Sequence, residues 1–358
     1  MTRTVKIGDV KVGGRFPVRI QGMLKGNLKD KSSVLREAKR LQQEGAEVLR
    51  VAVKEAGDVA LLNHLRKQVH IPLVADIHFR YKLALQAIEA GFDGIRLNPL
   101  NIHKRAQVRE VVRQAKIAKV SIRVGVNAGG FKRKFANEQV LAKEMVTSGE
   151  RFIRILERED FFDTIVSMKA STVRATILAN RIFSQRFNYP LHLGVTASGP
   201  FLEAVVKSSM GIGALLQEGI GSIIRVSLTA PSFWEIRVAK FIMQALGVRQ
   251  FFPEIISCPT CSRCQVDLIH IVNSFQKEML RLHQKGYAFP EKIALMGCEV
   301  NGPGEAQQAD IGVAFGKRRG VIFQKGTIVG TLSEKNSVRE FIDKVKMKPR
   351  CMERSKCS

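Results

Sequence analysis

Eight short apolar segments, separated by amphipathic helical patterns, run through about the first 240 residues of the chain. They are rich in β-branched residues and are bounded by Gly, Pro or Asn, which is typical of buried strands. Because strands that alternate with helices form parallel sheets, and eight such units fit a closed barrel, we predict an α/β fold with a (β/α)8 TIM barrel over residues 1–247. The predicted strands are Val18–Gln21, Glu47–Val53, Leu73–Asp76, Gly94–Leu97, Ile122–Val126, Thr164–Ser167, Leu191–Val195 and Ile223–Val226.

Two of the intervening helices can be delimited from the sequence. Ser32–Glu44 and Lys82–Ala90 are amphipathic, and each is followed by a glycine, Gly45 or Gly91, that suits a helix C-terminus. The main alternative to a barrel is a doubly wound open sheet, which normally has a glycine-rich turn after its first strand. The pair Gly13–Gly14 stands before the predicted first strand, so the barrel is favoured.

The character of the sequence changes after Gly247, where cysteines appear for the first time. We predict a small α+β domain over residues 248–346 and a basic tail over residues 347–358. Its predicted elements are a helix at Val266–Gln284, strands at Ile293–Met296, Ile311–Ala314, Gly320–Phe323 and Thr327–Thr331, and a helix at Ser337–Lys346.

Polar and cationic side chains stand at the ends of the predicted barrel strands, where barrel enzymes place their chemistry. Arginine offers planar, bidentate donors that suit phosphate oxygens, so several arginines at one mouth favour a strongly anionic ligand such as a diphosphate. The alternative is that these cations form structural ion pairs with Asp76, Glu55 and Asp93. Asp76 and His78 could also serve acid–base or ligand-orienting roles. The strand-end residues are Gln21, Arg50, Asp76, His78, Arg96, Asn98, Arg123, Asn127, Lys169, His192, Thr196, Arg225 and Ser227, with Lys207 shortly after the seventh strand.

The chain is strongly basic, with 58 Lys and Arg against 32 Asp and Glu and a net charge of +26. Such a charge could attract nucleic acid, an acidic protein partner or a phosphorylated substrate, or could reflect a general bias toward basic residues. The charges are spread along the chain and no nucleic-acid-binding motif is present, so we expect no nucleic-acid partner. No segment is long and apolar enough for a membrane helix, and the N-terminus has no secretory signal, so we expect a cytoplasmic protein.

Four cysteines fall in two segments of the predicted second domain. Cys258, Cys261 and Cys264 lie in Cys-Pro-Thr-Cys-Ser-Arg-Cys, and Cys298 lies in a glycine-rich segment that also contains Glu305. A structural zinc site would want a second Cys-x-x-Cys pair or histidines near Cys298, and a redox dithiol would stand in a thioredoxin-like βαβ unit. Thiolates are the ligands of iron–sulfur clusters, so a cluster on these cysteines is favoured.

At these motifs the sequence resembles the bacterial 4-hydroxy-3-methylbut-2-en-1-yl diphosphate synthases, a family of iron–sulfur enzymes of the methylerythritol phosphate pathway. The resemblance extends from the N-terminus to about residue 345. It rests on residues 74–79 (VADIHF), 123–129 (RVGVNAG), 191–196 (LHLGVT), 207–208 (KS), 225–228 (RVSL), 256–261 (ISCPTC), 297–298 (GC) and 300–306 (VNGPGEA).

The resemblance implies a TIM barrel followed by a [4Fe–4S] domain, in a homodimer where one subunit's cluster domain closes over the other's barrel mouth. It implies reductive ring opening and dehydration of 2-C-methyl-D-erythritol 2,4-cyclodiphosphate to 4-hydroxy-3-methylbut-2-enyl diphosphate, with electrons from reduced flavodoxin or ferredoxin. A different small diphosphate is the alternative substrate. The implied cluster ligands are Cys258, Cys261, Cys298 and Glu305; the substrate-binding residues are Arg50, His78, Arg96, Arg123, Asn127, Lys207 and Arg225; and the catalytic residues are Glu235, Glu305, Asp76 and His78.

The chain departs from the usual family pattern at Gly22, Leu24, Leu100, Ala197 and Pro231. Gly22 and Leu24 lack hydroxyls that we expect near the substrate mouth, and Ala197 lacks a carboxylate. Cys264 adds a thiol that the family does not usually have, and its closeness in sequence leaves it open as a fourth cluster ligand in place of Glu305.

Overall fold

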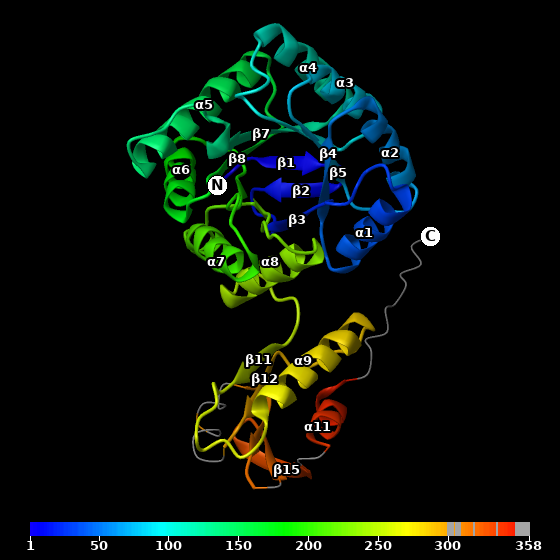
Figure 1. The fold of residues 1–358 in the computed structure, drawn as a ribbon, viewed down its shortest axis with the longest axis vertical. Coiled ribbons are helices and arrows are strands. Elements are labelled where there is room, and N and C mark those ends of the chain that lie inside the picture. Colours follow the sequence, from blue (N-terminus) through cyan, green and yellow to red (C-terminus); the bar gives the residue numbers. More distant parts are fainter. Residues whose placement is uncertain (299–303, 305–308, 318, 334–335, 348–358) are drawn as a thin grey trace. The chain divides into compact units, whose positions relative to one another are not determined.

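The computed structural model describes residues 1–298, 304, 309–317, 319–333 and 336–347, and the chain divides into two compact units, residues 1–249 and residues 250–358 (Figure 1). The two units are described separately. Glu305 and most of the predicted basic tail lie outside the described residues.

The first unit is a ring of parallel strands surrounded by helices, as the sequence predicted (Figure 1). Each of the eight predicted strands is present. The helix-ending glycines are also confirmed, since Gly45 and Gly91 have φ values of 96° and 88°, which favour glycine. The strands are β3 (Arg19–Met23), β4 (Val48–Val53), β5 (Leu73–Ile77), β6 (Gly94–Leu97), β7 (Ser121–Asn127), β8 (Thr164–Lys169), β9 (His192–Leu193) and β10 (Ile223–Ile224). The helices are α1 (Lys31–Gln43), α2 (Ala56–Arg66), α3 (Tyr81–Glu89), α4 (Arg105–Ala118), α5 (Glu138–Arg158), α6 (Val173–Arg186), α7 (Phe201–Gln217) and α8 (Phe233–Ala245).

The barrel closes through a short contact between β8 and β9, the two strands at the ends of the hydrogen-bonded order. The hydrogen-bonded order is β8-β7-β6-β5-β4-β3-β10-β9. A parallel bridge between Val166 and Leu191 then joins β8 to the residues just before β9, and the Val166 N–H donates to the Pro190 carbonyl over 2.9 Å. All eight carboxyl ends therefore lie at one mouth, which is where barrel enzymes bind their ligands.

An N-terminal hairpin that the sequence patterns did not predict packs against the opposite end of the barrel. Its strands, β1 (Thr4–Ile7) and β2 (Val10–Gly13), pair antiparallel. Val5, Ile7 and Val12 join a buried cluster with residues from the first halves of four barrel strands, including Val48 and Ile165. The hairpin thus covers the end away from the mouth and leaves the carboxyl ends of the strands free for a site.

The second unit is a five-stranded sheet in the order β11-β12-β13-β14-β15, with two helices packed on it. The sequence predicted all of these elements except β11. The main core contains residues from both helices and from four strands, including Phe275, Leu295 and Phe341. None of the described helices is long and apolar enough to cross a membrane. The elements are β11 (Glu254–Ser257), α9 (Leu268–Gln284), β12 (Lys292–Met296), β13 (Ile311–Phe315), β14 (Arg319–Gln324), β15 (Thr327–Ser333) and α11 (Ser337–Val345).

Candidate functional site

Three charged residues stand side by side at one level of the barrel. Asp76 on β5 pairs in register with Arg96 on β6, and Arg96 pairs with Arg123 on β7. Side chains of directly paired residues leave a parallel sheet on the same face. All three residues are less than 7% exposed. Sheet register therefore gathers into the interior three residues that lie far apart in the sequence.

Asp76 is the central carboxylate of this group. Its two oxygens contact Arg96 Nη1 at 3.3 Å, Arg50 Nη2 at 3.4 Å and His78 Nε2 at 3.3 Å. Burial by itself would raise the pKa of Asp76, but Arg50, the hydrogen bond to His78 and Arg96 together lower that pKa far below its ordinary value. Asp76 is therefore ionised at neutral pH, and it holds its cationic neighbours in place.

Arg123 is held by neutral groups. Its Nη1 donates to Gln21 Oε1 over 2.6 Å and lies 2.6 Å from His192 Nδ1. Burial, followed by the charge of Arg50, holds the pKa of Arg123 below its ordinary value, and burial followed by Lys169 and Arg123 holds the pKa of His192 well below 6.5. His192 is therefore neutral at physiological pH.

Lys169 at the end of β8 is a buried ammonium group. It is 7% exposed, and its Nζ has no hydrogen-bond partner among the described residues. Burial, then the charges of Arg123 and Arg225, hold its pKa well below 10.5. Burial also lowers the pKa of Arg50 to about 10, despite the favourable charge of Asp76. A buried cation without a partner is costly unless a ligand supplies the opposite charge.

Glu235 on α8 is the second carboxylate of the group. It is 1% exposed and contacts Lys25 Nζ at 2.8 Å and Arg225 Nη2 at 3.3 Å, and it accepts a 3.0 Å hydrogen bond from the Leu228 N–H. Besides Lys25, Asp76 and Glu235 therefore face five cations that influence one another electrostatically, and this excess of positive charge suits an anionic ligand. The five cations are Arg50, Arg96, Arg123, Lys169 and Arg225.

Asp93 and Glu55, two of the three carboxylates in the structural ion-pair alternative, have partners outside this group. Asp93 pairs with Arg66, and Glu55 forms a capping box with Asp58 at the start of α2. Of the three carboxylates considered, Asp76 alone contacts the strand-end arginines within the described residues. The pairing alternative thus accounts for part of the positive charge, and the excess remains.

The remaining predicted substrate residues lie at the edge of the group. Asn127, at the end of β7, pairs in register with Lys169. Lys207 on α7 is 40% exposed, lies 3.6 Å from Glu203, and is close to Gly199 in the loop after β9. The sequence places Lys169 and His192 among the strand-end residues, but no separate role was predicted for either. Their positions alongside the strand-end arginines were the sequence signal that could have identified them as site residues.

Glycines decide two local features. A Cβ at Gly125 would lie 2.3 Å from Arg96 Nε, so only glycine lets this guanidinium lie flat on β7 and donate to the Gly125 carbonyl over 2.8 Å. The expectation about Gly22 is wrong. A Cβ at Gly22 would meet Leu49, Ala46 and Ile236, because this position faces apolar side chains, including one from α8, instead of the mouth.

The cysteines of the second unit lie on two adjoining loops. Strands β11 and β12 pair in parallel with Ser257 opposite Leu295, so Cys258 and Cys298 both follow the carboxyl end of a strand. The Gly297 N–H approaches Cys258 Sγ at 3.4 Å, and a Cβ at Gly297 would lie 2.4 Å from Cys264 Sγ. Cys298 is buried, whereas Cys261 is exposed.

The donor set fits an iron–sulfur cluster in kind, since the free thiols of Cys258 and Cys264 on one loop lie beside Gly297, which precedes Cys298 in the other loop. In the described part of the chain, no three Cys, His, Asp or Glu residues are grouped as a metal site. The fourth predicted ligand, Glu305, is outside that part. Cys264 Sγ donates a hydrogen bond to the Val266 carbonyl over 3.2 Å.

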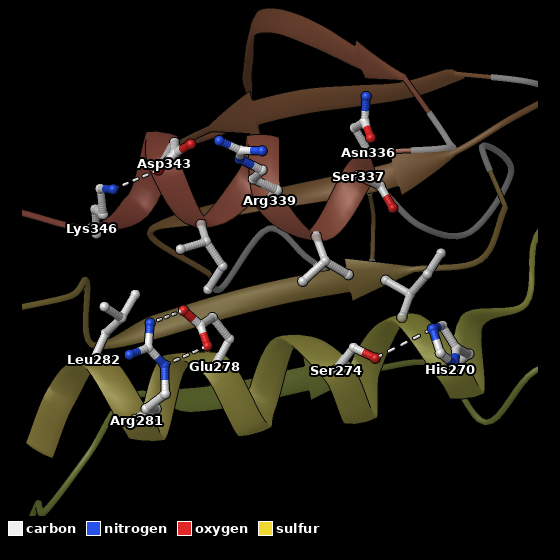
Figure 2. Close-up of a pocket in the computed structure, with 13 residues that line it drawn as sticks. His270, Ser274, Glu278, Arg281, Leu282, Asn336, Ser337, Arg339, Asp343 and Lys346 are labelled. Atoms are coloured by element: carbon white, nitrogen blue, oxygen red, sulfur yellow. Dashed lines mark hydrogen bonds and ion pairs between the residues drawn. The ribbon is translucent and has the colours of Figure 1, made fainter.

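A groove of about 650 Å³ lies between α9 and α11 of the second unit (Figure 2). Glu278 accepts a 2.7 Å hydrogen bond from Arg281, and Asp343 pairs with Lys346. Ser274 and His270 contact each other at 3.4 Å. Because two of its cations are already paired with carboxylates of the same groove, this groove lacks the large excess of one charge that distinguishes the barrel interior.

The fold and its charged interior define the class: a TIM-barrel enzyme for an anionic ligand, joined to a smaller unit with clustered cysteines. Residues 2–240 match the family model described as the GcpE TIM-barrel domain, and residues 254–347 match the GcpE protein C-terminal domain. The chain belongs to this family, the 4-hydroxy-3-methylbut-2-en-1-yl diphosphate synthases, which are oxidoreductases of isoprenoid biosynthesis.

Curated relatives match the chain over nearly its full length. A 4-hydroxy-3-methylbut-2-en-1-yl diphosphate synthase (flavodoxin) of Thermodesulfovibrio yellowstonii is 45% identical over 347 residues, which are 96% of this chain and 98% of the relative. The enzyme of the same name from Shouchella clausii is 44% identical over 349 residues, which cover 96% and 94% of the two chains.

Solved structures of other proteins share the barrel. A dihydropteroate synthase of Xanthomonas albilineans superposes with a TM-score of 0.51 at 11% identity, over 69% of this chain and 99% of its own. A truncated 3-deoxy-D-arabino-heptulosonate 7-phosphate synthase of Thermotoga maritima gives 0.50 at 17% identity, over 69% and 94%. At these identities the similarity shows the fold alone.

Proposed function

We propose that the barrel binds 2-C-methyl-D-erythritol 2,4-cyclodiphosphate and that the enzyme converts it to 4-hydroxy-3-methylbut-2-enyl diphosphate. The reaction takes up two electrons and two protons, opens the cyclic diphosphate and releases one water. The observation that carries the proposal is the excess of positive charge around Lys169 and Arg123, in a chain whose family is named for this diphosphate product. Family membership favours this substrate over another small diphosphate.

Arg50, Arg96, Arg123 and Arg225 would bind the diphosphate through bidentate, charge-assisted hydrogen bonds. Lys169 would gain the counter-charge that it lacks among the described residues. His78, Asn127 and Lys207, which we also assign to the substrate, would add contacts at the edge. The buried cations keep fixed positions before the substrate arrives, so little reorganisation is needed when the diphosphate binds.

Asp76 and Glu235 have more than one possible task in the reaction. Asp76 is ionised and holds Arg50, Arg96 and His78, so it orients the cations that bind substrate. We assign proton delivery to Glu235, with His78 as an acid–base partner that is 47% exposed at the mouth. Glu235 contacts Lys25 and Arg225, so its carboxylate lies beside one of the arginines that we assign to the substrate.

Cys258, Cys261, Cys298 and Glu305 would hold a [4Fe–4S] cluster. When bound, this group supplies the two electrons, one at a time, and a Lewis-acidic iron. Cys258 and Cys298 each follow the carboxyl end of one of the paired parallel strands β11 and β12, which supports a shared site. The name of the relatives supports reduced flavodoxin as the electron donor, with ferredoxin as the alternative.

We further propose a homodimer. Leu202, Val206 and Met210 are 73%, 50% and 60% exposed, and their four-residue spacing forms an apolar stripe along α7. Such a stripe on a surface helix supports contact with another protein surface. The test is the mass of the reconstituted protein in solution, and a monomer at micromolar concentration would refute the dimer.

The reaction is tested by anaerobic reconstitution followed by an assay with the cyclodiphosphate, dithionite and a mediator. We expect about four irons per chain and formation of 4-hydroxy-3-methylbut-2-enyl diphosphate. Full iron loading without turnover would count against this substrate, and a screen of linear and cyclic diphosphates would then identify another. Glu305→Ala is expected to keep part of the iron and lose most turnover.

A further inference from the structure

Arg123 is anchored across the interior of the barrel instead of along its wall. Its neighbours in the sheet are on β6 and β8, yet its Nη1 contacts Gln21 on β3 and His192 on β9, both at 2.6 Å. His192 is fully buried and Gln21 is 1% exposed. Two acceptors from separate strands thus converge on one nitrogen of the guanidinium.

The contact fixes the tautomer of His192. An arginine nitrogen can only donate, so Nδ1 of His192 must accept, and the ring proton lies on Nε2. This Nε2 is buried and has no hydrogen-bond partner among the described residues. A cavity of about 10 Å³ is lined by His192 itself, by the polar residues Gln21, Ser121 and Arg123, and by apolar residues. That volume is close to the minimum for one water, and the site offers enough polar partners to bind it.

The two acceptors differ from Asp76 in one decisive respect, because they are neutral. Asp76 holds Arg50 and Arg96 and also cancels part of their charge. An amide oxygen and a neutral imidazole can orient the guanidinium of Arg123 while its full positive charge stays available to an anion. The Nε–H of Arg123 has no partner in the described part of the chain, so the anchored group retains an unused donor.

We propose that Gln21 and His192 are positioning residues that fix the Arg123 guanidinium for the diphosphate of the substrate, with one buried water completing the hydrogen bonds of His192. The inference deepens the proposed function and rests on it for the identity of the anion. Neither residue touches the substrate in this scheme; both act through Arg123. Loss of one acceptor frees the guanidinium to rotate away from its like-charged neighbours, so anion affinity falls before chemistry does.

The test compares variants of the full-length, reconstituted protein in binding inorganic diphosphate, measured by calorimetry. We expect His192→Phe to raise the dissociation constant about tenfold, the effect of losing one charge-assisted hydrogen bond. His192→Gln restores an acceptor and should recover most of the affinity. Gln21→Glu keeps the acceptor but adds a negative charge, so it should also weaken binding. KM for the cyclodiphosphate should follow these changes, with kcat changing less than about threefold.

The matched control is Asn180→Leu, which removes another buried polar side chain that bonds the Met168 and Thr176 carbonyls. It should lower the melting temperature and leave diphosphate binding unchanged. If His192→Phe lowers the melting temperature in the same way without changing diphosphate affinity, His192 has a purely structural role. Equal losses in His192→Phe and His192→Gln would also overturn the proposal.

A second measurement uses the wild-type protein, so it does not require any variant to fold. Nitrogen-15 spectra of the histidine-labelled wild-type protein should show one ring that stays neutral and protonated at Nε2 about one unit below the ordinary imidazole pKa of about 6.5, because burial holds the pKa of His192 well below that value. A ring protonated at Nδ1, or a cationic ring, would refute the proposed geometry. Binding of inorganic diphosphate needs no turnover, so the positioning role and the proposed reaction can fail separately. If the variants change diphosphate affinity as expected but the wild-type protein does not convert the cyclodiphosphate, the proposed reaction is refuted and the positioning role remains.

Discussion

Lys169→Met should make the protein more stable and bind its ligand less well. The ammonium group of Lys169 is 7% exposed, has no hydrogen-bond partner in the described residues and is surrounded by Arg123, Arg225 and Arg50. Methionine has a similar length and no charge. Replacing buried charges by apolar groups of similar volume can stabilise a protein by about 1–4 kcal/mol. We expect about 2 kcal/mol, which corresponds to a melting temperature roughly 4–8 °C higher for a unit of this size.

The gain in stability has a definite pH dependence. The folded-state pKa of Lys169 lies well below the ordinary 10.5, so the burial penalty is fully present below the folded pKa. As pH rises through that value, the folded protein loses the proton while the unfolded chain keeps it, and wild-type stability increases. The advantage of Lys169→Met should therefore shrink as the pH is raised from 7 toward 10.

The assay pairs melting curves without anion with calorimetry of inorganic diphosphate. We expect Lys169→Met to weaken diphosphate binding about 10–100-fold, because a hydrogen bond to a charged group contributes about 1.5–3 kcal/mol. Lys116→Met, on the exposed face of α4, is the control and should change neither quantity. A Lys169→Met protein that melts below wild type without anion would refute the reasoning, since it would show that the ammonium is stabilised in the free protein.

Three further changes test separate parts of the site. Gly125→Ala places a methyl group 2.3 Å from Arg96 Nε; we expect a cost of about 1–3 kcal/mol in thermal unfolding and at least tenfold weaker diphosphate binding, and unchanged affinity would mean that Arg96 does not bind the anion. Gly22→Ser should lower the melting temperature by crowding apolar neighbours and leave KM unaltered. A lower KM would show that this position faces the substrate at the mouth. Cys264→Ser should keep the iron content of the reconstituted protein, and loss of the iron would show that Cys264, with its contact to Val266 broken, is a ligand.

The barrel could be predicted because its signals are local. Each predicted strand is a β-branched run between breakers, and helices such as α1 (Lys31–Gln43) and α3 (Tyr81–Glu89) have an apolar stripe and a glycine shortly after their last residue. The N-terminal hairpin and Glu254–Ser257 were missed. Their three strands have four residues each, and such a short run carries little information by itself.

The sequence by itself determined which residue types stand at the strand ends, and therefore that the mouth is cationic. It could not determine which cations are paired. That depends on sheet register, which sets Asp76 beside Arg96 and Arg123, and on cross-barrel contacts, which bring Gln21 and His192 to one arginine. The side of the sheet that position 22 faces was likewise decided by the strand, because alternate residues face opposite sides of a sheet. Charge content is a property of the chain, but pairing and burial are properties of the folded barrel.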